Sequence, residues 1–92
     1  MMTDEIRAII DKKENQKMFR DTLNNAARIG AYGNMFSALV FYVSILDTFE
    51  VEEAYFREYY EARVWLEAKA KSKETNAKFF ACYIDGSLRE HS

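Results

Sequence analysis

The sequence predicts an all-α domain, a small bundle of four helices, or of five if the first helix is broken. Three observations predict it. The chain of 92 residues has no proline and only three glycines, so signals for turns between short strands are few. From Ile29 to Leu46, eighteen residues carry no charge, and the twelve from Met35 are apolar at ten positions. The next segment has the composition of a long amphipathic helix.

The first helical segment begins after Thr3, a suitable N-cap, and has two acids in its first turn, where the helix dipole favours negative charge. Apolar residues then recur at helical spacing to about Ile29. The entirely polar run 11–17 leaves two interpretations open. The segment is either one long helix or two helices broken near Glu14 and Asn15.

A central apolar helix is expected over residues 34–46, after a turn at two glycines, with Asn34 as its N-cap. Val40, Val43 and Ile45 are β-branched, so a buried strand is the competing interpretation, but the length favours a helix. Only about half of a helix surface faces the core of a small bundle. The helix has more apolar residues than that half can hold, and this excess predicts self-association. The residues assigned to the self-association surface are Phe36, Val40, Phe41 and Val43.

A long amphipathic helix is expected over residues 50–71. Its acids come first and its bases last, which is the order that a helix dipole favours. Five aromatic residues and two arginines fall within residues 54–65, and these residue types are enriched at binding hot spots. The residues assigned to partner binding are Phe56, Arg57, Tyr59, Tyr60 and Arg63.

The remaining segment, residues 77–84, is expected to be a short helix, or an edge strand that ends in an Asp85–Gly86 turn. Residues 87–92 are expected to be a frayed tail, so residues 1–92 form a single helical domain.

Composition and motifs exclude several classes of function. Thirteen basic residues balance fifteen acidic ones, which argues against a generic nucleic-acid binder. His91 lies in the expected tail, and Cys82 lies among apolar residues where an inert thiol is expected. No phosphate-binding glycine loop and no metal-ligating cluster is seen in the sequence. We therefore expect no enzyme, no cofactor and no metal.

The leading hypothesis is a non-enzymatic module that binds a protein partner, as a homo-oligomer such as a homodimer. In size, class and lack of chemistry the chain resembles, in kind, the small inhibitors that phages and mobile elements direct at host machines, anti-CRISPR proteins among them. This resemblance carries over no residue.

Two other hypotheses remain: a helical oligomer that binds a nucleotide or nucleic acid between subunits, and a small membrane protein. The apolar run is shorter than the about 20 residues that a membrane span needs, so membrane association is not expected. The absence of a signal-peptide pattern and the single cysteine predict a cytoplasmic protein, in the host cell if a phage encodes it.

Overall fold

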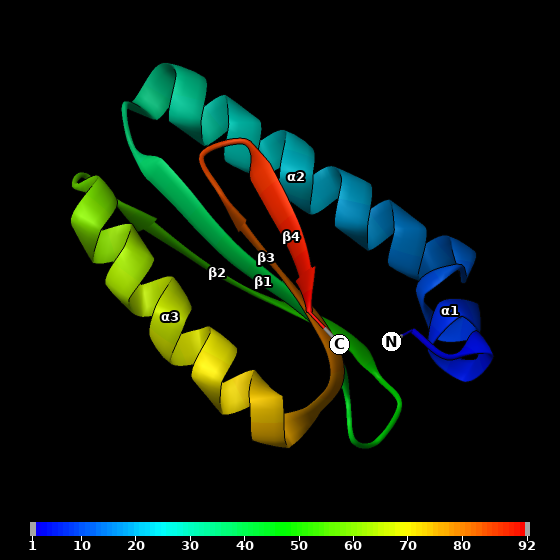
Figure 1. The fold of residues 1–92 in the computed structure, drawn as a ribbon. Helices are drawn as coiled ribbons and strands as arrows, with labels where there is room; N and C mark the ends of the chain where they lie inside the picture. Colours follow the sequence, from blue (N-terminus) through cyan, green and yellow to red (C-terminus); the bar gives the residue numbers. More distant parts are fainter. Residues whose placement is uncertain (1, 92) are drawn as a thin grey trace.

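A computed structural model describes residues 2–91 and overturns the predicted all-α class. Within that range, three helices combine with a four-stranded antiparallel sheet (Figure 1). The elements in chain order are α1 (Asp4–Ile10), α2 (Lys13–Gly33), β1 (Phe36–Ser44), β2 (Phe49–Phe56), α3 (Tyr59–Asn76), β3 (Ala77–Ile84) and β4 (Ser87–His91). The strand order is β2-β1-β3-β4, so β2 and β4 are the edges of the sheet.

The first helical segment consists of two helices, as one of the two interpretations predicted. The break lies at Asp11 and Lys12, slightly earlier than expected. The Thr3 side chain accepts a hydrogen bond of 3.2 Å from the backbone N–H of Ile6, which confirms Thr3 as the N-cap of α1.

The predicted turn before β1 is wrong, because α2 continues through both glycines to Gly33. Asn34, expected to begin a helix, ends one instead. It is the C-cap of α2 in the left-handed conformation, with φ 57° and ψ 37°. Asparagine tolerates this conformation better than other residues with a side chain, so the local sequence still explains the chain reversal.

The expected central helix over residues 34–46 is also wrong, since residues 36–44 form the strand β1. The competing interpretation, a buried strand, is the one observed. Leu39, Phe41 and Val43 face α1 and α2, whereas Val40 and Tyr42 face α3. Because both faces are covered, both sets of side chains are apolar, and the alternation that reveals a half-buried strand is missing.

The expected helix over residues 50–71 is wrong in its first part, where residues 49–56 form β2. Phe49 and Val51 pack beneath α2, and acids occupy intervening positions of this edge strand. These acids resemble the charges of a first helical turn, which explains the error. The helix α3 begins only at Tyr59 and extends to Asn76.

The last two strands form a hairpin. Residues 77–84 are the strand β3, which lies inside the sheet between β1 and β4 rather than at an edge. The expected frayed tail is wrong, because residues 87–91 form β4; residue 92 lies outside the described residues. Asp85 and Gly86 join the strands with φ values of 47° and 82°. Two positive φ angles are the signature of a tight two-residue hairpin turn.

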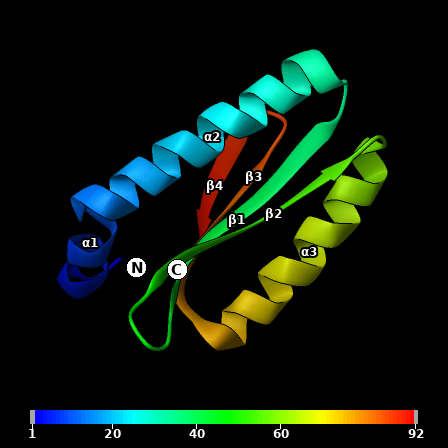
Figure 2. The same ribbon diagram turned by 180° about the vertical axis from the view of Figure 1, so that it is seen from behind.

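The sheet is covered on both faces, which gives three layers (Figures 1 and 2). On one face, Ala26 of α2 packs against Phe41; on the other, Leu66 of α3 packs against Val40. Both β2 and β3 run antiparallel to β1 and are therefore parallel to each other. The helix α3 crosses the sheet to join them.

The apolar stretch that suggested a membrane protein is divided between the end of α2, the strand β1 and the turn after it. Among the helices of residues 2–91, none combines the length and the hydropathy that a membrane span requires.

Candidate functional site

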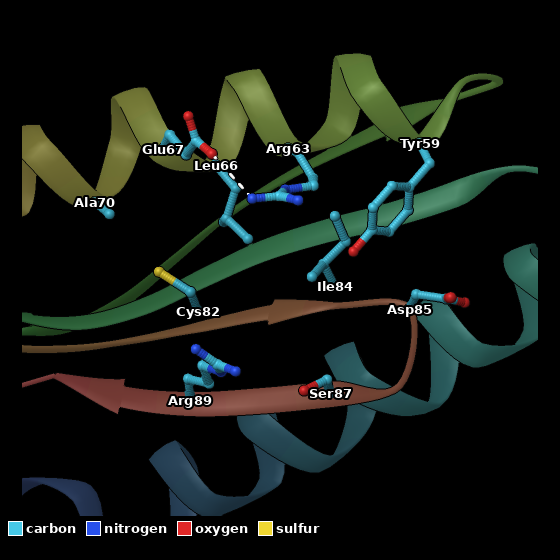
Figure 3. Close-up of a pocket in the computed structure, with 10 residues that line it drawn as sticks. All are labelled: Tyr59, Arg63, Leu66, Glu67, Ala70, Cys82, Ile84, Asp85, Ser87 and Arg89. Carbon is cyan, nitrogen blue, oxygen red and sulfur yellow. Dashed lines mark hydrogen bonds and ion pairs between the residues drawn. The ribbon is translucent and has the colours of Figure 1, made fainter.

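An open groove of about 560 Å³ lies between α3 and the β3–β4 hairpin (Figure 3). Tyr59 and Arg63 line it from α3, Cys82 and Ile84 from β3, and Arg89 from β4. Side chains from segments that are distant in the sequence therefore face one another across a single hollow.

Helical spacing directs one side of α3 toward this groove. Tyr59, Arg63, Leu66 and Ala70 follow one another at intervals of four, three and four residues, so they lie on the same side of the helix. Leu66 is buried against the sheet and fixes the orientation of that side. The helix packs chiefly on β1 and β3, and residues 87–90 of β4 remain exposed.

The strand pairing supplies the opposite wall. Cys82 lies opposite Arg89, and Ile84 lies opposite Ser87. Directly opposed residues of neighbouring strands project from the same face of a sheet. All four side chains therefore stand on the α3 face, with the apolar ones nearer the helix and the polar ones toward the sheet edge.

Tyr59 is the aromatic side chain of the groove. It is 41% exposed, and its ring meets the ring of Phe36 edge-to-face at 5.5 Å. Figure 3 shows the ring directed from α3 toward Ile84. The contact with Phe36 restrains the ring while leaving much of it accessible, which is favourable for an anchor that binds without large loss of entropy.

The charges of the groove are balanced in number but not all paired. Arg63 contacts Glu67 at 3.4 Å, and both side chains are more than half exposed, so the pair is weak. Arg89 and Asp85 form no ion pair among the residues that the structure describes. The hairpin side of the groove thus offers one unpaired guanidinium and one unpaired carboxylate.

Cys82 forms part of the floor and is only 8% exposed. Burial raises the pKa of its thiol. Since the thiolate is the reactive form, this shift makes Cys82 a poor nucleophile. The side chain serves as a small apolar contact in the layer between α3 and the sheet.

A second polar cluster lies beneath α3, toward β2. Glu52 pairs with Lys69 and with Lys73, each at 2.7 Å. The Nζ atom of Lys73 also lies 3.8 Å from the ring centroid of Tyr42, and that of Lys69 lies 5.5 Å from the ring of Trp65. These contacts attach α3 to the edge of the sheet, so we assign the cluster a structural role.

The charges of this cluster stabilise one another. Hydrogen bonds from Lys69 and Lys73 lower the pKa of Glu52 to about 2. Burial by itself would lower the pKa of Lys73, but its interactions with Glu52, together with those with Tyr42, outweigh burial and raise that pKa. Both groups therefore remain charged throughout the neutral range.

The predicted partner-binding residues are divided among several places. Tyr59 and Arg63 line the groove. Phe56 is half-buried and packs on Trp65 at a centroid distance of 6.2 Å. Tyr60 is 76% exposed and is not among the groove residues, and Arg57 borders a separate hollow beside α2.

The residues assigned to self-association all belong to β1. Val40 and Val43 are fully buried, Phe41 is 2% exposed, and Phe36 is half-buried. The apolar surplus that suggested a second copy is covered by the helices of the chain itself. Self-association stays a prediction, but its contact surface has to lie elsewhere.

Sequence reasoning missed Ser87 and Arg89, because they were placed in a frayed tail. The signal that could have revealed them is the Asp85–Gly86 pair, which favours a hairpin when extended segments flank it. It also missed the cluster around Glu52, whose lysines appeared to be scattered around a solvated helix. Their spacing of four residues was visible, but a partner on β2 was not.

Comparison of the chain with protein-family models, with curated proteins and with solved structures finds no match.

Within the described part of the chain, no three side chains of His, Cys, Asp or Glu are grouped so that they could hold a metal ion. A function has therefore to be inferred from the groove itself.

Proposed function

We propose that this chain is a non-enzymatic module that binds a protein partner in the groove between α3 and the β3–β4 hairpin. Tyr59 and Arg63 are the expected anchors on the helix, and Arg89 faces them from the strand. The observation that carries the proposal is the convergence of an exposed aromatic ring and two guanidinium groups on an apolar floor.

The composition of the groove favours a protein over other ligands. Tyrosine and arginine dominate binding hot spots, and a mixed apolar floor with a polar rim is typical of protein interfaces. A nucleic acid would require an excess of positive charge, whereas Glu67 and Asp85 balance the two arginines here. The alternative of a nucleotide-binding oligomer therefore receives less support.

A binder without chemistry of its own acts by occupying a surface of its partner. This mode agrees with the proposed role as a small inhibitor of a larger machine. The likeness to phage-encoded inhibitors now rests on size and on the lack of catalytic motifs alone, because the helical class on which it also depended is wrong.

The proposal is tested by capturing partners from the native host and measuring the affinity of each purified partner. Tyr59→Ala and Arg63→Ala should each weaken binding by at least about 2 kcal/mol, which is the loss expected at a hot spot. Tyr60→Ala is the matched control, since Tyr60 is the adjacent tyrosine but is not part of the groove. A melting curve for each variant separates lost binding from lost folding.

The proposal fails if folded Tyr59→Ala and Arg63→Ala proteins bind as tightly as the wild type. It also fails if Tyr60→Ala alone removes binding, because the partner would then contact the outer side of α3. Binding of nucleotides that shifts the melting temperature, with no effect of protein partners, would favour the alternative function.

A further inference from the structure

The strand β4 offers an open edge beside the groove. It is an outer strand, paired only with β3 among the described strands. In a hairpin closed by two residues, the flanking residues form a hydrogen-bonded pair and the pairing alternates outward from them. The turn at Asp85 and Gly86 therefore directs the backbone N–H and C=O groups of Leu88 and Glu90 away from β3, toward the open edge.

The groove is incomplete on the same side. Its residues come from α3, β3, the turn and β4, and none comes from an element beyond β4. A strand added at this edge would extend the floor, and its side chains on the α3 face would form the missing wall opposite Arg63. The open backbone edge and the open side of the groove thus lie next to each other, where one added strand would cover both.

We propose that β4 accepts an extended segment of the protein partner as an additional antiparallel strand. The exposed side chains of β4 define its chemistry: an acid opposite Arg89, a base opposite Glu90 and an apolar residue opposite Leu88. Opposite charges on directly facing residues favour one register and one orientation. This inference rests on the proposed function and specifies how the partner is held.

The other edge of the sheet is less suited to this role. The strand β2 carries Glu50, Glu52 and Glu53, so acids project from both of its faces. The charges of β2 are all of one sign, and Glu52 is already paired with Lys69 and Lys73, whereas Arg89 and Glu90 of β4 are one base and one acid. On β4, by contrast, Arg89 has no carboxylate partner among residues 2–91, and Leu88 leaves 42% of its surface exposed.

A second copy of the chain fits the edge less well than a partner segment does. Two β4 strands that overlap fully around a two-fold axis place Arg89 opposite Arg89. Like charges in directly opposed positions destabilise strand pairing. The charge pattern of β4 therefore complements a different sequence better than it complements itself.

The test uses two blocked peptides of identical composition, added to the isotopically labelled protein at up to millimolar concentration. The complementary probe is acetyl-Thr-Thr-Lys-Glu-Val-Thr-Thr-amide, and the control exchanges its lysine and glutamate. We expect the complementary probe to shift the backbone amide signals of Leu88 and Glu90 and to bind about tenfold more tightly than the control. In the folded double variant Arg89→Glu/Glu90→Arg, the preference should reverse.

The inference is overturned if neither probe binds, if both bind equally, or if the double variant keeps the original preference. A dimer that forms through β4, seen by light scattering and lost in Leu88→Pro, would overturn it in favour of a second copy. Leu88→Pro removes an outward N–H and is compatible with an edge strand, and Leu88→Ala is its control.

The native partner separates the two proposals. If capture depends on Tyr59 and Arg63 but Leu88→Pro binds normally, the groove function stands and strand addition fails. If capture depends on neither the groove residues nor the β4 edge, the proposed function fails as well.

Discussion

Lys73 of α3 and Glu52 of β2 form an ion pair of 2.7 Å beneath the helix. Lys69 contacts the other oxygen of the same carboxylate, also at 2.7 Å. One acid on an edge strand thus holds two successive turns of α3 in place. This arrangement makes the stability of the fold sensitive to the charge of Glu52.

Acid should weaken the fold through Glu52. Its pKa is about 2 in the folded protein, below the ordinary value of 4.5, so its stabilising contribution is present above pH 4.5 and is lost as the pH falls toward 2. A shift of this size corresponds to about 3 kcal/mol, and partial exposure of the side chain reduces the expected effect to about 2 kcal/mol. Urea unfolding of wild type and Glu52→Gln across this range measures it.

The difference between the two proteins should be largest near neutral pH and vanish at the acid end of the range. Glu74→Gln is the control, since Glu74 forms no ion pair within residues 2–91. A constant difference between wild type and Glu52→Gln at every pH would show that Glu52 acts through packing and not through charge.

Removal of Lys73 should cost more unfolding free energy in the wild type than in a protein whose Glu52 has already been replaced. Lys73→Met leaves the carboxylate of Glu52 with one cation and removes the contact with the Tyr42 ring, a loss of about 2 kcal/mol. The double variant Glu52→Gln/Lys73→Met should be more stable than the sum of the single effects predicts. Denaturant unfolding of the four proteins gives the coupling energy, and strict additivity would contradict the assigned pair.

Truncation of Phe41 should be among the most destabilising changes in the core. Its ring is 2% exposed and lies 4.7 Å from the ring of Phe19 and 6.3 Å from that of Phe49. Phe41→Ala should cost about 3–5 kcal/mol. Phe36→Ala is the comparison, because Phe36 lies on the same strand but is only half-buried. Equal losses of unfolding free energy for the two variants would argue against the observed layer structure.

The same substitution at two glycines should have opposite effects. Gly86 has a φ of +82° with no atom within 4 Å of an added Cβ, so Gly86→Ala should cost about 1 kcal/mol through backbone strain alone. Gly30 lies inside α2, where an added Cβ would make only an ordinary contact at 3.6 Å. Gly30→Ala should therefore stabilise the protein by about 0.5–1 kcal/mol. Thermal unfolding compares the two, and a stabilising Gly86→Ala would contradict the hairpin geometry.

Self-association is expected to use the tip of the β1–β2 hairpin, now that β1 itself is known to be covered. Ile45 and Leu46 are 62% and 82% exposed there. Light scattering should give a mass above the 10.8 kDa of one chain, and Ile45→Ser/Leu46→Ser should return it to that value. If light scattering of the wild-type protein gives the mass of one chain, the prediction of a homo-oligomer is wrong.

The helical N-terminal part could be predicted from the sequence because its signals are local. Thr3 is followed by acids and then by apolar residues at helical spacing, and each of these features acts within one or two turns. The strands could not be predicted in this way. Val40 and Phe41 project from opposite faces of β1, and both are apolar only because a helix covers each face, which is a fact of tertiary structure.

The candidate site was predicted on its helical side only. Tyr59 and Arg63 stand out as residue types that bind partners, wherever the helix begins. Arg89 belongs to the groove only because β4 pairs with β3 and places it opposite Cys82. Glu52 belongs to an ion-pair cluster only because α3, which follows it in the chain, brings Lys69 and Lys73 to it. Such relationships depend on topology, which charge patterns along a single chain do not encode.

The central place of β1 has a consequence for the newly made polypeptide. The strands β1 and β2 follow α1 and α2 out of the ribosome, and β3, which pairs with the other side of β1, emerges only after the whole of α3. Val40 lacks its covering helix until α3 has emerged, and one row of backbone groups of β1 has no neighbour until β3 has followed. The nascent chain is therefore most prone to aggregation in this interval, when a holding chaperone would help it most.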